Sequence, residues 1–547
     1  MRRAVALTAL LAALSAGPVI AQEAPTFSAD RFNQDVRILS DDSFLGRGIG
    51  TEGETKTIQY ISEQFAAAGL QPGGPGGSWT QPVTLNRFAV SNLNASLNAG
   101  DWSLAIQQGE QAVISTRRPA ESVSLQNAEL VFVGYGINAP ERNWNDFKGQ
   151  DLTGKILVVL VNDADFEQPE LNTFGGAAMT YYGRWTYKYE EAARQHAAGV
   201  LIVHETDPAS YGWGTVDNSW SAPQFDIVRE NAAAERVPLE AWVQRDVAVD
   251  LFRRAGLDFE QLKVQARSAD FQPVPLTGVT LNANFDVATT QIETANVIGR
   301  LAGSTHPDES VLFTAHWDHI GVGDPDANGD TIFNGAVDNA TGTAAIIELA
   351  RAFGAAPRTE RSLVFIGFTA EESGLLGSEF YAANPVYPLE TTVGGFNIDA
   401  TDVYGRTEAL SVVGYGQSDF DDRLVAPVEA QGRRILPDDR PQAGAYFRSD
   451  HFPLAKRGVP MAYVGAGGAY RDEPIAERQA RAEEYGRSRY HQAADEWSAD
   501  WDVRGALEDL DVIYEIGRDL ANSRDWPQWR ETSEFAPARA ASASARE

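Results

Sequence analysis

The sequence predicts an α/β fold with a mostly parallel central sheet, helices on both faces of it, and a second, smaller domain. From residue 289 onward, short β-branched or aromatic runs alternate with helical stretches such as ATGTAAIIELARAF and LLGSEFYAAN. The runs are ANVIGRL, SVLFTAH, SLVFIGF, GGFNIDA and ALSVVGY. Alternation of this kind is typical of a parallel sheet covered by helices on both sides.

A change in the sequence pattern over residues 117–275 indicates the second domain. There AELVFVGYGI, GKILVVLV and VLIVHE predict buried strands, and YEEAARQHAAG predicts a helix. A chain of 547 residues exceeds the usual size of one domain, so an inserted module is expected. We therefore predict an inserted α/β or β-rich domain over 117–275, flanked by the two parts of the main domain over 27–116 and 289–530.

The first part of the main domain begins with helices. Ile58, Ile61 and Phe65 recur at helical spacing, and Gly69 ends that pattern. Between about residues 88 and 116 the pattern alternates and predicts strands joined by tight turns. At the other end, residues 534–547 are rich in Ser and Ala and are predicted to be a disordered tail.

The N-terminus predicts export. Arg2 and Arg3 precede an apolar run over residues 4–16, and Ala21 ends a stretch suited to signal cleavage. This pattern is typical of a secretory signal peptide, here residues 1–21, and is too short for a spanning helix. No other stretch is long and apolar enough to cross a membrane, so we expect a periplasmic or extracellular protein without membrane insertion.

The charge and the cysteine count narrow the possible partners. The formal net charge is −31, and such a surface repels nucleic acid, which we do not expect as a partner. The chain contains no cysteine, so any metal ion must be held by nitrogen and oxygen ligands.

Five short segments combine acids and histidines in a way that predicts a metal site. They are AHWDHIGVG, GAVDNATG, FTAEESGLLGS, FNIDATD and RYHQAADEW. Three of them follow predicted strands, and open α/β sheets bind ligands at the carboxyl ends of their strands. Residues far apart in the sequence are therefore expected to meet at one edge of the sheet.

Zinc takes His and carboxylate ligands, and a pair of zinc ions is most simply spanned by one bridging carboxylate. Asp338 is the candidate bridge. His316 and Asp399 are expected to complete the protein ligands of one ion, and Glu372 and His491 those of the other. A zinc pair beside a spare carboxylate indicates a hydrolase that activates water against an amide or ester.

Four further residues are candidates for supporting roles. Glu371 is expected to point away from its neighbour on an extended segment and to act as general base. Asp318 is expected to accept the second N–H of the first ligand histidine, and Asp495 that of the last, if its segment is helical. Tyr490 is a candidate donor to the developing oxyanion.

These segments resemble the co-catalytic zinc aminopeptidase family, a superfamily with leucyl or aminopeptidase S-like, glutamate carboxypeptidase-like and transferrin receptor-like members. The matching strings span about 180 residues in a specific order, and they include NGAVDNATGTA, SDHFPLAKRGVP and YHQAADEW. The resemblance implies the zinc exopeptidase fold, two zinc ions and a peptide substrate. It supports the same five ligands and Glu371 as the general base. Tyr490 and Asp318 also match residues of the family's pattern. Residues 117–275 resemble a protease-associated domain.

Three functions remain open from the sequence. The first is an aminopeptidase that releases N-terminal residues from peptides. The second is a carboxypeptidase or dipeptidase of the same fold, which needs arginines for a substrate carboxylate; Arg448, Arg487 and Arg489 are candidates. The third is a non-catalytic binding protein, which the intact ligand set argues against.

Overall fold

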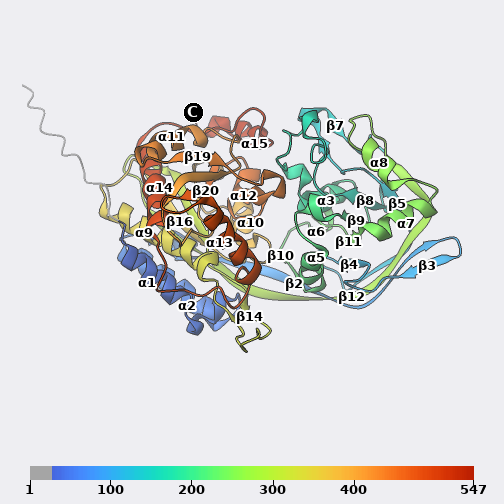
Figure 1. Cartoon of the computed structure of the whole chain (residues 1–547), viewed down its shortest axis with the longest axis horizontal. Helices are drawn as coiled ribbons and strands as arrows, with labels where there is room; N and C mark the ends of the chain where they lie inside the picture. The colour runs from blue at the N-terminus through green and yellow to red at the C-terminus, as the bar shows by residue number, and fades with distance from the viewer. Residues whose placement is uncertain (1–26, 547) are drawn as a thin grey trace, which may run out of the picture.

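The computed structural model describes residues 27–546, and these form two lobes joined by two long strands (Figure 1). β2 (Thr80–Ala99) and β12 (Val274–Leu301) pair in antiparallel fashion along nearly their whole length and run from one lobe into the other. The expected signal peptide, residues 1–21, lies outside the described residues.

The first lobe is built on four parallel strands. β16 (Arg361–Phe368), β13 (His306–His316), β17 (Thr392–Asn397) and β20 (Met461–Tyr470) lie next to one another in that order. Phe313 at the centre of β13 is level with Phe365 and Phe396 on its neighbours, and its ring stacks on both of theirs.

Alternating side chains of these strands pack against helices on opposite faces. Phe313 and its neighbours on the same face pack against α9 (Thr341–Ala355) and α14 (Arg504–Asn522). Leu312 points the other way, because side chains of a strand alternate, and packs in a core with α10 (Leu376–Ala383) and α12 (His451–Lys456). The predicted α/β fold with helices on both faces of the sheet is confirmed.

The strands at the centre of the sheet are parallel, whereas an antiparallel pair follows on each side of them. β12 is antiparallel to β16, and β18 (Thr407–Val413) is antiparallel to β20. β19 (Arg434–Pro437) then pairs in parallel with β18. The sheet is therefore mixed.

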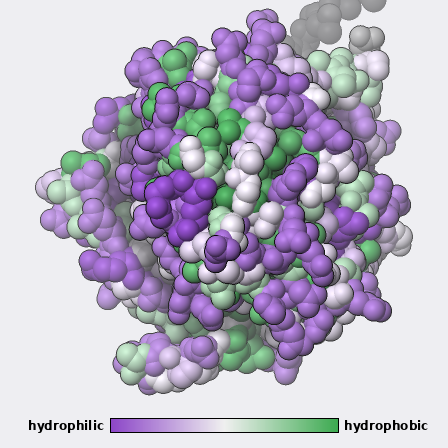
Figure 2. Space-filling model, turned by 90° about the vertical axis from the view of Figure 1, so that its right-hand side faces the viewer, coloured by the Kyte–Doolittle hydropathy of each residue, from purple (hydrophilic) through white to green (hydrophobic). Residues whose placement is uncertain are grey.

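The second lobe has a core of its own. Its strands β5 (Ser122–Phe132), β8 (Ile156–Leu160), β9 (Gly199–His204) and β11 (Leu239–Gln244) are parallel. Helices cover both faces with their apolar sides, α3 (Trp185–Arg194) and α5 (Trp213–Ser221) on one and α7 (Arg245–Arg254) and α8 (Phe259–Gln265) on the other. Hydrophilic residues cover most of the outer end of this lobe, and hydrophobic ones show through near its middle (Figure 2).

The change from one lobe to the other falls inside the long strands and not at the predicted boundaries of 117 and 275. β4 (Ala112–Ser115), expected in the main domain, pairs with β11. Leu97, near the end of β2, is buried in the core of the second lobe, as is Leu281 near the start of β12. Continuous strands show no composition shift at the point where they change cores, so the sequence did not mark it.

The helical start is present as predicted. α1 (Ala29–Leu39) and α2 (Glu52–Ala67) pack on the core of the first lobe, with Thr51 capping α2 by accepting from two backbone N–H groups. The remaining helices and strands are α4 (Thr206–Ala209), α6 (Ala232–Glu235), α11 (Phe420–Ala430), α13 (Ile475–Ser488), β1 (Gln71–Pro72), β3 (Trp102–Ala105), β6 (Asn138–Ala139), β7 (Trp144–Asn145), β10 (Gln224–Ile227), β14 (Gly321–Val322) and β15 (Ile332–Phe333).

The tail from residue 534, predicted to be disordered, is ordered. It forms α15 (Ala536–Ala541), and the buried Arg539 donates hydrogen bonds to the carbonyls of Thr392 and Val393. Phe535 joins an aromatic cluster with Tyr446. The prediction of disorder was wrong because it rested on the Ser- and Ala-rich composition. That composition gives no sign of the contacts by which Arg539 and Phe535 anchor the tail.

Candidate metal centre

Three neighbouring parallel strands of the first lobe bring their carboxyl ends together at one edge of the sheet. β13 ends at His316, β16 leads into Glu371 and Glu372, and β17 leads into Asp399. Because β13 pairs in parallel with both β16 and β17, the three strand ends lie side by side. Open α/β sheets bind their ligands at this position.

Asp338 lies between two histidines, in the turn Ala336–Ala340 that leads into α9. Its Oδ1 is 3.3 Å from His316 Nε2, and its Oδ2 is 3.3 Å from His491 Nε2. Gly335 opens the turn with a φ of +53°, and a Cβ there would lie 2.2 Å from the carbonyl oxygen of Asp338. One carboxylate thus faces the two imidazoles with different oxygens, which is the arrangement a bridging ligand requires.

Each of these histidines also faces a carboxylate of its own. His316 Nε2 is 3.2 Å from Asp399 Oδ1. His491, in the loop after α13, has its Nε2 3.1 Å from Glu372 Oε2. The five predicted ligands therefore come together as two sets that share Asp338.

The donor set of these residues fits a pair of cations. His491 Nε2 is buried, and although the carboxylates of Asp338 and Glu372 lie within 3.3 Å, it makes no well-aligned hydrogen bond to any described residue. The donor atoms of His316, Asp338 and Glu372 all lie within 4.8 Å of one another. Imidazole and carboxylate are ligands that zinc takes, and several buried carboxylates repel one another unless a cation offsets their charge.

Glu371 lies beside this set with no hydrogen bond to its carboxylate from any described residue. Its Oε2 is 3.9 Å from His316 Nε2, and together with Asp399 these two residues form a second group of donor atoms within 4.8 Å. Burial, together with the charges of Asp399 and Glu372, raises the pKa of Glu371 well above its ordinary value. The distance between Glu371 and His316 is compatible with two roles for Glu371, that of a metal ligand and that of a general base.

Asp318 does not make the contact predicted for it. The atom next to His316 Nδ1 is the main-chain carbonyl oxygen of Asp318, at 3.2 Å, whereas the carboxylate Oδ1 is 3.8 Å away. That carboxylate instead accepts from the backbone N–H groups of Glu371 and Glu372, at 3.1 and 3.4 Å. Asp318 therefore positions the loop of the two glutamates.

Asp495 also acts on a different partner from the one expected. It lies outside any helix, and its carboxylate accepts from the backbone N–H groups of Val337 and Asp338 and from the hydroxyl of Tyr485. Its effect is to fix the turn that carries Asp338, not the ring of His491.

Two residues near the centre have roles that the sequence pattern did not predict. His319, whose side chain is fully buried, has its Nδ1 2.6 Å from Glu372 Oε1. Arg47 is also fully buried and donates to four backbone carbonyls, including those of Trp317 and Gly335. The string LGRGIG gave no indication of the Arg47 contacts, because three of the four carbonyls lie 270 to 288 residues away along the chain.

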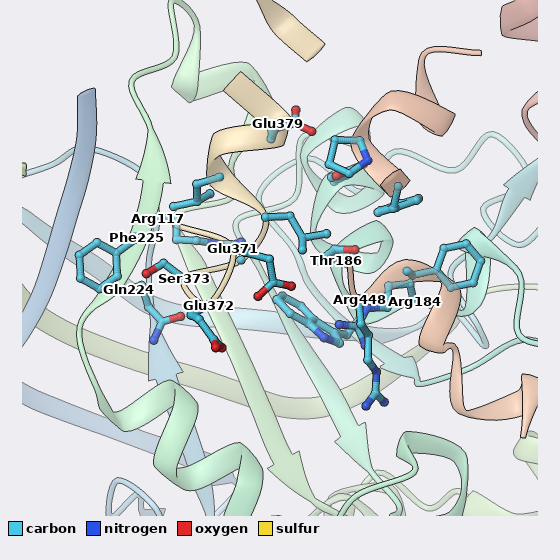
Figure 3. Close-up of a pocket in the computed structure, with 18 of the residues that line it drawn as sticks. Arg117, Arg184, Thr186, Gln224, Phe225, Glu371, Glu372, Ser373, Glu379 and Arg448 are labelled. Carbon is cyan, nitrogen blue, oxygen red and sulfur yellow. The ribbon is translucent and has the colours of Figure 1, made fainter. Parts of the chain in front are cut away.

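Tyr490 lies at the mouth of the centre. Its ring stacks on that of His491 with centroids 3.9 Å apart, and 48% of the residue is exposed. Both residues line a cavity of about 270 Å³ between the two lobes, together with Glu371 and Glu372 (Figure 3). The phenol therefore stands beside the space a substrate would enter, and its part in catalysis stays a prediction.

Known proteins resemble parts of this chain. Residues 296–512 match the profile described as Peptidase family M28. "Aminopeptidase NAALADL1" of Mus musculus is 32% identical over 304 residues, which cover 45% of this chain and 39% of that protein. "Aminopeptidase YwaD" of Bacillus subtilis (strain 168) is 35% identical over 107 residues, which cover 19% of this chain and 21% of that protein.

A solved structure, the aminopeptidase from Aneurinibacillus sp. strain AM-1, has a TM-score of 0.49 and 20% identity, and the alignment covers 90% of this chain and 94% of that one. The chain spans less than half the length of the two curated relatives named above.

The matched residues 296–512 contain His316, Asp338, the Glu371–Glu372 pair, Asp399 and His491, so the family match and the metal centre coincide. The resemblance predicted from the motifs is confirmed. This segment matches peptidase family M28, and its motifs resemble those of the co-catalytic zinc aminopeptidases and the glutamate carboxypeptidase-like proteins.

Proposed function

We propose that the protein is a di-zinc metallo-exopeptidase that hydrolyses peptide bonds and, as an aminopeptidase, releases N-terminal residues. The position of Asp338 carries the proposal, since its two oxygens face His316 and His491 at 3.3 Å each. His316 and Asp399 would hold one ion with it, and Glu372 and His491 the other. Zinc ions held by these residues would lower the pKa of a bound water and polarise the scissile carbonyl.

Glu371 supplies the proton transfers of this reaction. Its carboxylate accepts a proton from the attacking water and then donates it to the nitrogen of the leaving amine. The absence of a hydrogen bond to its carboxylate from any described residue supports this role, as does its place beside the proposed ligands. Tyr490, at the edge of the same cavity, is proposed to donate its hydroxyl hydrogen to the oxygen that becomes negative.

A dipeptidase or carboxypeptidase is the second candidate, because one of the three arginines proposed to bind a substrate carboxylate lines the cavity. Arg448 lines the cavity beside Glu371. Arg489 is 3.6 Å from Glu484, and neither it nor Arg487 is among the residues that line this cavity. A purely binding function is disfavoured by the complete donor set.

Export and the identity of the second lobe belong to the same proposal. The apolar run near the N-terminus supports secretion to the periplasm or the extracellular space. Across residues 27–546, no helix combines the length and the apolar character that a bilayer crossing needs. The parallel strands and covering helices of the second lobe support the proposal that this lobe is a protease-associated module. We propose that it forms a wall of the cavity.

A panel of peptides with free and blocked ends tests the function. We expect turnover of peptides and aminoacyl anilides with a free N-terminus by the zinc-loaded protein, and no turnover after N-acetylation. Cleavage of N-acetylated peptides that keep a free C-terminus would favour the carboxypeptidase instead. If the zinc-loaded protein cleaves none of them, the peptidase proposal is wrong.

A further inference from the structure

The ordered tail contacts both lobes. On the first lobe, the indole N–H of Trp529 donates to a main-chain carbonyl at 3.0 Å, and Arg539 donates to two more. On the second lobe, the backbone N–H of Tyr181 donates to Glu534 Oε1 at 3.0 Å. Residues 529–539, here called the strap, therefore contact the two lobes at once. Figure 1 shows α15 at the top of the first lobe, on the side next to the second lobe.

Phe535 of the strap lies in an apolar cluster to which both lobes contribute. Its ring centroid is 6.3 Å from that of Phe452 in α12, and the ring of Phe452 is in turn 5.2 Å from that of Tyr181. Met179, from the second lobe, is buried in the same cluster, and its backbone N–H donates to the carbonyl of Pro441 in the first lobe at 3.1 Å. The strap thus supplies one side chain of an apolar joint between the lobes.

This joint lies directly behind a wall of the cavity. Phe452 and a second member of the cluster, Phe447, also line the cavity that contains Glu371. Three residues after Tyr181, the segment 184–186 forms part of the wall contributed by the second lobe. The position of the second lobe at the joint therefore sets the distance between the two walls.

Partly exposed ion pairs also join the lobes near the cavity. Lys456 of α12 pairs with Glu190 of α3 at 3.1 Å, and their side chains are 21% and 22% exposed. Glu379 of α10 lies 3.9 Å from Arg229 of the second lobe. Ion pairs that water reaches contribute little, and domains of one chain move relative to each other unless an apolar interface holds them. We therefore expect the apolar joint to hold the lobes more firmly than these ion pairs do.

We propose that the strap holds the second lobe against the first and thereby sets the width of the cavity, with Glu534 and Phe535 as its positioning residues. The inference rests on the proposed function, because it places the substrate in the cavity beside Glu371. A short peptide fills a cavity of about 270 Å³ and contacts both walls, whereas the far part of a longer peptide extends beyond them. Loosening the strap should therefore weaken the binding of short peptides more than that of long ones.

The first test measures the distance between the lobes. Because the chain contains no cysteine, Asp246→Cys and Arg434→Cys introduce two unique sites for spin labels, one in each lobe. Both positions are exposed and lie outside the joint. In Glu534→Ala/Phe535→Ala, double electron–electron resonance should give a broader distribution of label distances, shifted to longer values than in the labelled wild type. An unchanged distribution in a folded, zinc-loaded protein would reject the strap.

Three further variants separate the strap from general damage. Glu534→Ala removes only the contact with Tyr181 and should give part of the broadening. Glu534→Gln keeps an oxygen that accepts from the same N–H and should restore the distribution of the wild type. Arg530→Gln removes an ion pair between the strap and Asp422 of the first lobe, and should leave the distribution unchanged. Broadening by Arg530→Gln as large as that of the double variant would contradict the roles of Glu534 and Phe535.

Kinetics test the effect on the substrate. Leu-Gly and Leu-Gly-Gly-Gly-Gly-Gly share one scissile bond and differ in length. In the double variant, KM for Leu-Gly should rise about 10-fold, the effect of losing one buried contact, while kcat stays within about twofold and KM for the longer peptide within about threefold. Equal rises in KM for the two peptides would contradict a strap that sets the width of the cavity.

The two readouts keep the strap separate from the proposed function. If the zinc-loaded wild type cleaves no peptide, the proposed function is wrong, but a broadened distance distribution in the double variant still supports the strap. If peptides are cleaved and the distribution broadens while both KM values stay unchanged, the strap holds the lobes without acting on the substrate, and its role in specificity is wrong.

Discussion

His319→Leu should weaken one metal position and spare the other. His319 Nδ1 is 2.6 Å from Glu372 Oε1, which leaves Oε2 facing His491 at 3.1 Å. Leucine removes the donor but keeps an apolar group in a fully buried position. A hydrogen bond to a charged group contributes about 1.5–3 kcal/mol, so affinity for the ion at Glu372 should fall roughly 10- to 150-fold. The ion at His316 and Asp399 should bind as before.

Competition with a chromogenic chelator measures the two binding constants separately. His319→Asn is the matched variant, because its amide nitrogen is as far from the backbone as Nδ1 and can restore the donor. His306→Leu, at a part-exposed position outside the centre, controls for loss of a histidine. If the His319→Leu protein binds both ions like the wild type, or if Asn is no better than Leu, His319 does not position Glu372.

Other variants test other parts of the structure. Glu371→Gln should keep both metal ions and lose about 10²–10⁴-fold in kcat, whereas loss of metal would make Glu371 a ligand. Gly335→Ala places a Cβ 2.2 Å from a carbonyl oxygen and should lower zinc content and melting temperature; an unchanged zinc content would contradict the role of this turn. Arg539→Met removes two buried hydrogen bonds and should lower unfolding free energy by about 2 kcal/mol; unchanged thermal unfolding would mean that α15 contributes no stability.

The strand ends that carry the centre were predictable because they depend on local patterns. A buried run followed by an acid or a histidine marks the carboxyl end of a strand, and neighbouring parallel strands then place such residues together. This reasoning brought His316, Glu372 and Asp399 to one edge of the sheet. The family resemblance supported the same set, together with Asp338 and with His491, which follows a helix and has no strand before it.

The partners of the supporting residues were not predictable in the same way. Asp318 and Asp495 were assigned to imidazoles, yet both accept from backbone N–H groups of loops that carry metal-ligand candidates. A backbone donor leaves no trace in the sequence, because every residue other than proline has one. Arg47 was missed because it acts across an interface between distant segments, where spacing along the chain carries no information.

Anomalous diffraction at the zinc edge, on crystals grown without added metal, is the most direct test of the metal centre. We expect two peaks per chain, one on each side of the Asp338 carboxylate, with one near His316 and Asp399 and the other near Glu372 and His491. A single peak, or peaks that do not contact Asp338, would contradict the di-zinc centre and the hydrolysis proposed to depend on it.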